Sequence, residues 1–398
     1  MRSLAILSMH TSPLAQPGSG DGGGMNVYVR ELAAALGRAG VECDVYTRAT
    51  APTEHAVVDV EPGFRVHHVP AGPLAPVAKD ELPAFVEEFG EGVLTRIEHG
   101  YEPQAIHANY WLSGIAGHAL KHRLDLPLVS TFHTLARVKA EGDVAPERRA
   151  AAEAHVMGCS DAVLASCSVE ARQIVELYGA DRDRIEIVAP GVDHAFFSPG
   201  HRPQARRALG LPADRPVLLF VGRIQPLKGL DVAVRALDRL EGALLVVVGG
   251  PSGPEGEAEI ERVHALPAAD RVRWVPPQPH ELLSTYYRAA DVCLVPSRSE
   301  SFGLVALEAA ACGTPVVAAA VGGLRTLVEH GRTGFLVEGR DPDAFASHAA
   351  ELLADPLLAA ELSVAAAERA RGYTWRLAAA RLRRLYEDLT SRALVECP

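Results

Sequence analysis

Short apolar runs alternate with longer amphipathic stretches along almost the whole chain, and this alternation limits the fold more than any other feature. Apolar runs of about four to eight residues are typical of buried strands, and the longer stretches repeat apolar residues at helical spacing. Strands that alternate with helices form a parallel sheet with helices on both faces. In the first half, strands are expected at Leu4–Ser8, Val41–Thr47, Ala105–Ala108, Leu128–Thr131, Ala162–Ala165 and Ile185–Val188. Helices are expected at Met25–Ala39, Leu82–His99 and Arg148–Cys159.

The alternation breaks at a linker rich in proline and glycine. Phe197-Ser-Pro-Gly-His-Arg-Pro is followed by Leu211-Pro-Ala-Asp-Arg-Pro. Because 398 residues exceed one ordinary core, we expect a first domain over 1–196 and a second over 197–373. The strands of the second are expected at Val217–Val221, Leu244–Val248, Val272–Val275, Val292–Val295, Val316–Ala318 and Phe335–Val337. Two doubly wound α/β domains are thus predicted to face a central cleft, where such sheets bind ligands.

Composition and charge disfavour several other classes of protein. The net charge of -11 argues against a nucleic-acid binder, because phosphate binding needs a basic face. No apolar run reaches about 18 residues, so we expect no membrane span. The apolar part of Met1–Ser8 is too short for a signal peptide. The six cysteines form no CxxC pair and are expected to be free buried thiols in a reducing cytoplasm.

A glycine-rich segment lies between the first expected strand and the first helix. It reads Gly18-Ser-Gly-Asp-Gly-Gly-Gly-Met-Asn-Val-Tyr, and its spacing is not GxGxxG. Glycines let a backbone approach a ligand closely, and amides at a helix start point at anions. A flexible surface loop is the alternative. Asn26, just inside the helix, either bonds a sugar hydroxyl or serves as a cap residue.

A pair of cations follows the strand expected at Val217–Val221. They are Arg223 and Lys228 in the segment Phe220-Val-Gly-Arg-Ile-Gln-Pro-Leu-Lys-Gly-Leu. Arg offers a planar fork and Lys a mobile point charge, so the two aimed at one point would neutralise a leaving diphosphate. Two unrelated surface cations in a loop explain the spacing equally well.

Two glutamates follow the strand expected at Val292–Val295, in Pro296-Ser-Arg-Ser-Glu-Ser-Phe-Gly-Leu-Val-Ala-Leu-Glu. Glu308 lies in an otherwise apolar helix, where a carboxylate is costly unless it is paired or hydrogen-bonded. We therefore expect Glu308 to accept the hydroxyls of a ribose, and Glu300 those of a transferred sugar. The helix start at Phe302–Leu304 would face phosphates. A solvated glutamate on a helix face is the alternative.

These three motifs together resemble the family 4 retaining glycosyltransferases, which have the GT-B fold. The Glu-Ser-Phe-Gly-Leu…Glu and Val-Gly-Arg…Pro-Leu-Lys-Gly segments are both signatures of that family, and the resemblance covers essentially the whole chain. It implies two Rossmann-like domains, of which the first binds the acceptor and the second the nucleotide sugar. A helix over 374–392 is then expected to pack back on the first domain.

Further segments resemble a group within that family, the enzymes that open mycothiol biosynthesis by moving GlcNAc from UDP-GlcNAc to 1D-myo-inositol 3-phosphate. These segments are His10-Thr-Ser-Pro-Leu, Gly23-Gly-Met-Asn-Val-Tyr, Tyr46-Thr-Arg, Tyr110-Trp-Leu-Ser-Gly, His133-Thr-Leu-Ala and Gly249-Gly-Pro-Ser-Gly-Pro. The resemblance implies that the acceptor phosphate is held by Lys79, Tyr110, Thr134 and Arg149. It places the inositol beside His10, Asp21, Gly22, Gly23, Met25 and Asn26. The donor would be met by Gln16, Pro17, Gly24, Arg223, Lys228, Gln278, Glu300, Phe302, Gly303, Leu304 and Glu308.

The proposed acceptor pocket also has a physical rationale of its own. Two cations and two hydroxyls in one pocket suit a phosphate dianion better than a neutral sugar. Without the resemblance, the four residues would pass as unrelated surface and core positions. The chain departs from the family at His107-Ala-Asn-Tyr-Trp, at Gln278 in place of a common Arg, and in a short segment over 138–147, which makes Arg148 a neighbour candidate to Arg149.

The resemblance implies retention of the anomeric configuration by front-face attack, in which the acceptor hydroxyl gives its proton to the departing phosphate oxygen. Arg223 and Lys228 would stabilise UDP, Glu300 would orient the sugar, and His133 would bond its 6-hydroxyl, unless His133 is a core histidine at a strand end. We expect no metal to be required for catalysis. The group also implies a homodimer and a peripheral Mg²⁺, with ligands matching Tyr287, Arg288, Ala290 and Thr314.

Three other hypotheses stay open at this point. Another family 4 transferase would use a different acceptor, such as an antibiotic precursor, a sugar phosphate or a lipid-linked inositol. A UDP-GlcNAc 2-epimerase shares the GT-B architecture, but it lacks the Glu-Ser-Phe-Gly-Leu…Glu arrangement. A pure binding module leaves the charged donor set unexplained.

Overall fold

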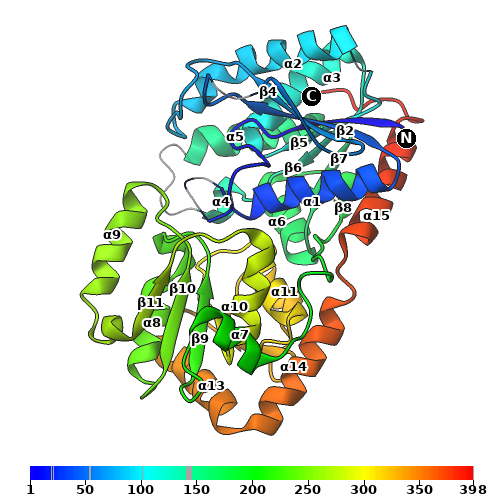
Figure 1. The fold of residues 1–398 in the computed structure, drawn as a ribbon. Helices are drawn as coiled ribbons and strands as arrows, with labels where there is room; N and C mark the ends of the chain where they lie inside the picture. Colours follow the sequence, from blue (N-terminus) through cyan, green and yellow to red (C-terminus); the bar gives the residue numbers. More distant parts are fainter. Residues whose placement is uncertain (19, 21, 53–54, 101, 140–145, 398) are drawn as a thin grey trace. The chain divides into compact units, whose positions relative to one another are not determined.

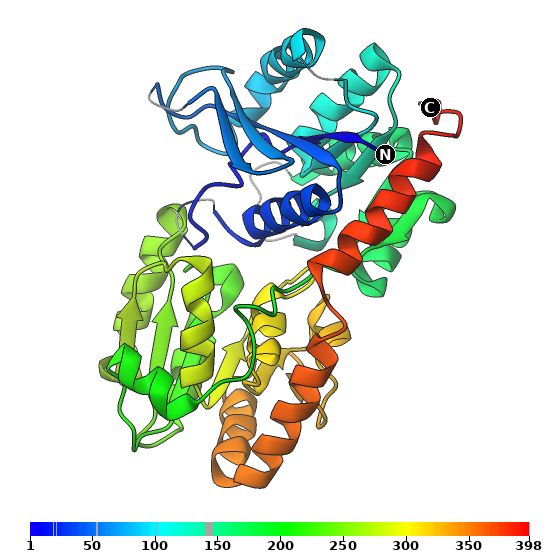
Figure 2. The same ribbon diagram turned by 45° about the vertical axis from the view of Figure 1, so that its right-hand side comes forward.

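The chain folds into two units in the computed structural model, which describes residues 1–18, 20, 22–52, 55–100, 102–139 and 146–397 (Figures 1 and 2). The first unit comprises Met1–Ala15, Met25–Ala189 and Trp375–Pro398, and the second comprises Gln16–Gly24 and Pro190–Thr374. The boundary therefore follows Ala189 and not residue 196. The glycine-rich residues Gln16–Gly24, which the sequence placed in the first domain, group with the second unit.

The first unit is built on one sheet with strand order β3-β4-β2-β1-β5-β6-β7-β8. Its strands are β1 (Ser3–Leu7), β2 (Glu42–Arg48), β3 (Val57–Glu61), β4 (Phe64–Val69), β5 (Ile106–Asn109), β6 (Leu128–Thr131), β7 (Ala162–Ala165) and β8 (Ile185–Ile187). Its helices are α1 (Gly24–Arg38), η1 (Leu82–Phe85), α2 (Val86–Gly100), α3 (Trp111–Leu124), α4 (Ala136–Lys139), α5 (Pro146–Cys159), α6 (Ser168–Tyr178), η2 (Arg182–Arg184) and α15 (Trp375–Leu389).

The sequence pattern did not reveal the hairpin of β3 and β4. β3 pairs antiparallel with β4 at the edge of a sheet whose other described pairings are parallel. Both strands alternate polar and apolar residues, as half-exposed strands do, and so they lack the continuous apolar run of the buried strands. A turn at Pro62 and Gly63 joins them, with Gly63 at φ 80°, a conformation that favours glycine.

Alternate strand residues such as Leu7, Ala108 and Val163 point into a core cluster with apolar residues of α2, α3 and α5. Figure 1 shows α2 and α3 on this face of the sheet and α1 on the other. A fully buried large apolar side chain contributes about 1.5–3 kcal/mol, so clusters of this kind supply most of the stability.

Helix α15 belongs to the first unit, although the whole second unit precedes it in the chain. Leu382 and Tyr386 are fully buried, and the Tyr386 hydroxyl lies 2.8 Å from Nδ1 of His107 on β5. Arg383 donates to the carbonyl oxygen of Ala39, just after α1, at 3.2 Å. Figure 2 shows the helix running beside α1.

The second unit has a sheet with strand order β11-β10-β9-β12-β13-β14, in which all described pairings are parallel. The strands are β9 (Val217–Val221), β10 (Leu244–Val248), β11 (Val272–Val275), β12 (Val292–Val295), β13 (Val316–Ala319) and β14 (Gly334–Val337). The helices are α7 (Arg202–Leu209), η3 (Pro226–Lys228), α8 (Leu230–Asp238), α9 (Gly253–His264), η4 (Pro267–Arg271), η5 (His280–Leu282), α10 (Leu283–Ala289), α11 (Leu304–Ala311), α12 (Leu324–Leu327), α13 (Pro342–Ala354) and α14 (Pro356–Ala370).

Each sheet has one point at which the strand order reverses direction. In the first unit this point lies between β1 and β5, and in the second it lies between β9 and β12. Open α/β sheets bind ligands in the crevice outside the carboxyl ends of the strands at such a point. The topology therefore marks two places to examine, one in each unit.

Two cysteines differ from the expectation that all six are free. The structure joins Cys159, at the end of α5, to Cys397 in a disulfide with a Cα–Cα distance of 4.7 Å. The two lie 238 residues apart in sequence, so only the return of the chain after α15 brings them together. In the described part of the chain, Cys43, Cys167, Cys293 and Cys312 are buried and form no disulfide, as expected.

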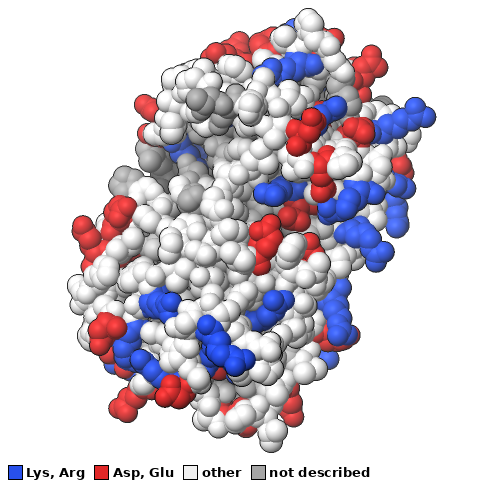
Figure 3. All heavy atoms as spheres, viewed as in Figure 1, with Lys and Arg blue, Asp and Glu red and all other residues white. Residues whose placement is uncertain are grey.

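The surface mixes both signs of charge. In Figure 3, Lys and Arg side chains alternate with Asp and Glu side chains over the visible face of each unit. Among the described residues, no helix is both long enough and apolar enough to cross a bilayer.

Candidate functional site

Two loops of the second unit meet at the reversal point between β9 and β12. The amide of Arg298, after β12, donates to the carbonyl oxygen of Leu227, after β9, at 2.8 Å. Gly229 has φ 73°, and a Cβ there would overlap the carbonyl oxygen of Pro296. Glycine is thus required for the close approach of these loops, which bring Lys228 and Glu300 together.

The ammonium of Lys228 pairs with the carboxylate of Glu300 at 2.6 Å. Both side chains are about one-fifth to one-quarter exposed, so the pair is accessible from solvent. Ser297 donates to the same Glu300 oxygen at 3.4 Å. Arg223 donates to the Ser252 hydroxyl at 3.4 Å. Lys228, which is predicted to bind the diphosphate, and Glu300, which is predicted to bind the sugar, are therefore neighbours. An arriving anion would compete with Glu300 for Lys228.

Gly303 lies immediately before α11 with φ 103°, which side chains rarely adopt, and a Cβ there would lie 2.7 Å from Leu324. Leu304 follows as the first helical residue, so the amides of this turn are open to an anion. The side chain of Phe302 is buried and packs edge-on against Tyr373, with ring centroids 5.8 Å apart. Phe302 therefore positions the turn, and its contact with a donor stays a prediction.

Glu308 is buried, and both of its carboxylate oxygens have partners in the protein. Oε1 lies 2.7 Å from Nε2 of His280, and Oε2 accepts from the Tyr287 hydroxyl at 2.8 Å. These bonds offset the cost of burying a carboxylate in an apolar helix. Neither partner was identified from the sequence, because they lie 28 and 21 residues away from Glu308 with no motif to connect them.

The glycine-rich segment lies against the donor motifs of the second unit. The Gly250 amide donates to the carbonyl oxygen of Gly18 at 3.0 Å, and the Ser252 hydroxyl donates to that of Gly20 at 2.9 Å. Gln16 donates to the carbonyl oxygen of Gln278. A Cβ on Gly23 would lie 3.2 Å from Arg223, and one on Gly24 would lie 3.5 Å from Leu304. Gln16 and Gly24 thus adjoin other predicted donor residues. Pro17 and Gly22 belong to the same segment. Asp21 lies outside the described residues.

The predicted acceptor residues of the first unit gather at its own reversal point. The guanidinium of Arg149 donates to the Thr134 hydroxyl at 3.0 Å and lies 5.0 Å from the centroid of the Tyr110 ring. The Tyr110 and His10 ring centroids are 4.3 Å apart. His10, Tyr110 and Thr134 follow β1, β5 and β6. Arg149, and not the exposed Arg148, meets Thr134, and the contact of either arginine with an acceptor phosphate stays a prediction.

The sequence did not reveal the partner of Arg149, which is Glu153. Its carboxylate is fully buried and accepts from Nε of Arg149 at 2.8 Å, from the Ala136 amide at 2.9 Å and from the Tyr178 hydroxyl. The two residues lie four apart on α5, and this spacing was the signal available in the sequence. The carboxylate orients the guanidinium and offsets part of its charge.

His133 and Tyr110 hold unusual backbone conformations. Among the described residues, the non-glycine residues with positive φ are Tyr110 at 75°, Asp125 at 53° and His133 at 60°. Such conformations tend to cluster at functional sites. Nε2 of His133 lies 2.8 Å from Oδ1 of Asn109, and burial, with the nearby His107, lowers the pKa of His133 to about 3. Its imidazole is therefore neutral at physiological pH and suited to hydrogen bonding.

The remaining acceptor residues are placed less decisively. Asn26 is buried and donates to the Thr11 hydroxyl at 2.7 Å and to the Ser12 carbonyl oxygen at 2.6 Å, so it orders the segment after β1. Met25 is half-buried beside it, and Lys79 is exposed in the segment between β4 and η1. Their contact with an acceptor stays a prediction.

The residues expected to hold magnesium fit that ion poorly. The carbonyl oxygen of Tyr287 accepts from the Thr314 hydroxyl at 2.7 Å and from the Ala290 amide at 3.1 Å, and the fourth member, Arg288, is itself a cation. Mg²⁺ prefers carboxylate oxygens and water in octahedral geometry, and this set has no carboxylate. Two pairs of carboxylates occur elsewhere in the chain, in the sequences Asp181-Arg-Asp and Asp341-Pro-Asp. In each pair the first aspartate caps a helix, since Asp181 and Asp341 accept from amides two residues onward at 3.0 and 3.1 Å.

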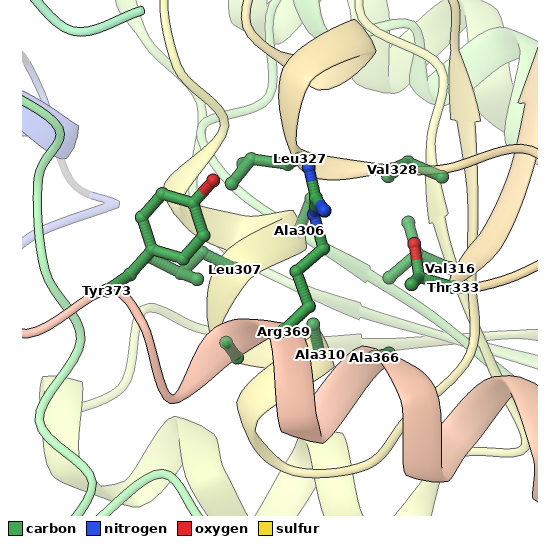
Figure 4. A pocket seen from close by; sticks show the side chains of 11 residues that line it. Ala306, Leu307, Ala310, Val316, Leu327, Val328, Thr333, Ala366, Arg369 and Tyr373 are labelled. Atoms are coloured by element: carbon green, nitrogen blue, oxygen red, sulfur yellow. The ribbon is translucent and has the colours of Figure 1, made fainter.

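A small cavity in the second unit is lined mainly by apolar side chains, and Lys228 and Glu300 are not among the residues that line it (Figure 4). It is lined by Ala306, Leu307, Ala310, Val316, Leu327, Val328, Thr333, Ala366, Arg369, Ala370 and Tyr373, and its volume is about 10 Å³. A space of that size holds about one water molecule, so it is a packing gap between α11 and α14 and not a nucleotide site.

Comparison with known proteins connects these clusters to a family. The profile of glycosyl transferases group 1 matches residues 201–372, and that of the glycosyl transferase 4-like domain matches residues 23–191. The D-inositol 3-phosphate glycosyltransferase of Xylanimonas cellulosilytica is 50% identical, with 98% of this chain and 97% of that protein covered. The enzyme of the same name from Mycolicibacterium smegmatis is 48% identical, with 94% and 88% covered.

Solved structures agree on the fold. The sucrose-phosphate synthase from Thermosynechococcus elongatus has a TM-score of 0.92 and 34% identity, with 98% of this chain and 100% of that chain covered. Anabaena HepE, solved in complex with UDP and glucose, has a TM-score of 0.79 over 97% of this chain and 99% of its own, at 19% identity. Both are GT-B structures, so the predicted fold class is confirmed.

Proposed function

This chain belongs to family 4 of the glycosyltransferases, and from that membership we propose that it transfers GlcNAc from UDP-GlcNAc to 1D-myo-inositol 3-phosphate with retention of configuration. The observation that carries the proposal is the identity of about 50% over nearly the whole chain with enzymes named for transfer to D-inositol 3-phosphate. The cluster at Arg149 gives this acceptor a physical rationale.

The donor is proposed to bind at the end of β9 and β12. The diphosphate of UDP would be met by Arg223, Lys228 and the amides at the start of α11, all of which favour an anion. Lys228 already pairs with Glu300, so a phosphate oxygen would replace or share that partner. Glu300 would then turn its carboxylate to hydroxyls of the sugar, as its position beside the cation allows.

The acceptor phosphate is proposed to bind at Tyr110, Thr134 and Arg149. The guanidinium presents planar donors to a phosphate, and the two hydroxyls add hydrogen bonds. Glu153 holds Nε of the guanidinium, and Nη2 donates to the Thr134 carbonyl oxygen and hydroxyl. Lys79 would supply the second cation.

The chemistry proposed is front-face substitution at the anomeric carbon. The bond from this carbon to the phosphate oxygen breaks as the acceptor hydroxyl approaches from the same face, and the hydroxyl proton passes to the departing phosphate oxygen. The protein contributes positioning and electrostatic stabilisation. A neutral His133 would form one hydrogen bond with the sugar, as donor or as acceptor, without adding charge. No step passes through a metal.

The test is release of UDP from UDP-GlcNAc, measured in a coupled assay with separate acceptors. The panel contains inositol 3-phosphate, free inositol, a sugar phosphate and vesicles with phosphatidylinositol. We expect strong stimulation by inositol 3-phosphate alone. Equal stimulation by another acceptor would reassign the acceptor within the family, and conversion of UDP-GlcNAc to UDP-ManNAc without acceptor would favour an epimerase.

Light scattering of the purified chain tests the homodimer that the sequence predicts.

A further inference from the structure

Three histidines and two cysteines gather on the first unit, and the proposed reaction uses none of them. His118 and His122 lie on α3, and His155 and Cys159 lie on α5. Cys397 joins them from the segment that follows α15. Their potential ligand atoms form two groups that share His118, and within each group all lie within 4.8 Å of one another.

The two helices present these side chains toward each other. Each helix carries its pair at a spacing of four residues, which places both members on one face. α3 and α5 pack closely, since a Cβ on Gly114 would lie 2.8 Å from Val156. The ring of His118 meets those of His122 and His155 edge-on, with centroids 4.8 Å apart in both cases.

A buried polar network independent of the sulfur atoms brings Cys397 to this face. Asp161 accepts from the Val395 amide at 2.7 Å, and Lys121 donates to the Val395 carbonyl oxygen at 3.0 Å. Lys121 and Asp161 are themselves paired at 2.8 Å, so the lysine charge beside the cluster is compensated. Lys121 also donates to the Cys159 carbonyl oxygen at 2.8 Å. The segment 393–397 is therefore held in place before any bond to Cys397 is considered.

The distances among the ligand atoms of three side chains, His118, His122 and Cys397, match one coordination sphere. Sγ of Cys397 lies 3.2 Å from Nε2 of His118 and 3.1 Å from Nε2 of His122, and these two nitrogens are 3.1 Å apart. Tetrahedral zinc with Zn–N of about 2.0–2.1 Å and Zn–S of about 2.3 Å has ligand–ligand edges of roughly 3.3–3.6 Å. The triangle differs from that by a few tenths of an ångström. Cys159 is bonded to Cys397 and its sulfur lies within 4.8 Å of a His118 nitrogen, so it is available as a fourth ligand after reduction.

We propose that His118, His122, Cys159 and Cys397 bind one Zn²⁺ when the two cysteines are reduced. Two equivalents of an external thiol convert the Cys159–Cys397 bond to two protein thiols and one external disulfide. Zn²⁺ then takes the place of the two thiol protons, which leave to solvent. The disulfide is the metal-free form of the same site, and His155 stands beside His118 outside the ligand set.

The site would fasten the end of the chain to α3 and α5 in either form. It would thereby hold α15, whose Tyr386 bonds to His107 in the sheet. Since four-coordinate Cys₂His₂ ligation is typical of structural zinc, the expected role is stability and not catalysis.

The experiment uses the untagged full chain, reduced with a phosphine, incubated with Zn²⁺ and freed of loosely bound metal on a chelating resin. We expect one Zn²⁺ per chain and, with Co²⁺ as a probe, the near-ultraviolet absorption of a thiolate–cobalt bond. C397S and the double variant H118A/H122A should lose both signals. H99A, which removes an exposed histidine of α2, and H155A should keep them.

A second readout separates the site from a folding defect. Zn²⁺ should raise the melting temperature of the reduced wild-type chain and leave that of C397S unchanged, while the circular dichroism of the two proteins agrees. Reduced wild-type protein without bound zinc would overturn the proposal and leave a disulfide only. Retention of zinc by H118A/H122A, its loss in H155A, or equal binding by the oxidised protein would overturn the proposed ligand set.

Discussion

The two reversal points present charge in different ways. At the end of β9 and β12, Lys228 and Glu300 lie on loops, are partly exposed and pair with each other. At the end of β5 and β6, Arg149 comes from a helix, is buried and is oriented by the fully buried Glu153. A nucleotide arriving at the first place must displace an ion pair, whereas an acceptor arriving at the second meets a preformed donor. The predictions below test this division between the two units.

The largest effect is expected from Lys228→Met. Removing a cation that faces the leaving diphosphate should lower kcat about 10²- to 10³-fold, as for the loss of one donor to developing negative charge. The acceptor KM should change little. Steady-state kinetics with both substrates varied will measure this, with Arg239→Met as the matched control. Arg239 is an exposed cation that follows α8 and pairs with Asp343 of α13. Its removal should leave kcat unchanged. A similar loss in both variants would break the assignment of Lys228.

A smaller effect concerns pH and the histidines of the first unit. Burial lowers the pKa of His107 and of His133 to about 3, and the unfolded chain takes up these protons near pH 6.5. The unfolded state therefore binds more protons at pH 5, and the free energy of unfolding falls as pH decreases from 6.5 toward 3. The loss at pH 5 should be about 2 kcal/mol for each histidine.

Urea unfolding at pH 7 and pH 5 checks this pH dependence. In His107→Gln, the difference between the two pH values should shrink by the share of one histidine, about 2 kcal/mol. If the variant and the wild-type chain lose the same amount, His107 is not neutral in the folded state.

Thr134→Val should raise the acceptor KM about tenfold, equivalent to one lost hydrogen bond to a charged group. It removes the hydroxyl near Arg149 and does not disturb the pair with Glu153. The donor KM should stay the same. Arg149→Ala is the less informative change, because it leaves Glu153 buried without its partner and costs about 3–5 kcal/mol of stability. An equal rise in both KM values for Thr134→Val would remove the acceptor role of this cluster.

The smallest expected effect is an absence of titration. His133 is neutral above about pH 5. The pH profile of kcat between pH 5 and 8 should therefore have the same shape in the wild-type chain and in His133→Asn. An inflection present in the wild-type chain and lost in the variant would mean that the imidazole takes up a proton during the reaction.

Local patterns in the sequence predicted much of the fold and the donor residues. Several buried strands have the predicted bounds, such as Leu128–Thr131 and Val217–Val221, since an apolar run bounded by polar residues depends on nearby residues alone. The hairpin of β3 and β4 was not predicted, because its exposed side chains interrupt the apolar runs. The partners Glu153, His280 and Asn109 were also missed.

Those partners illustrate why the remaining contacts could not be predicted from the sequence. His280 and Glu308 are 28 residues apart and meet only through the packing of η5 against α11. Cys159 and Cys397 depend on the return of the chain over the first unit. The bond between Gln16 and the Gln278 carbonyl oxygen likewise connects positions 262 residues apart. Contacts of this kind follow from tertiary topology and leave no periodic trace in the sequence.

Calorimetric titration with UDP, in wild-type protein, Lys228→Met and Thr134→Val, tests the division of the two substrates between the units most directly. UDP should bind Lys228→Met at least about tenfold more weakly, which corresponds to about 1.4 kcal/mol, and should bind Thr134→Val as it binds the wild-type chain. Unchanged UDP affinity in Lys228→Met, or weakened affinity in Thr134→Val, would contradict the assignment of the nucleotide to the second unit.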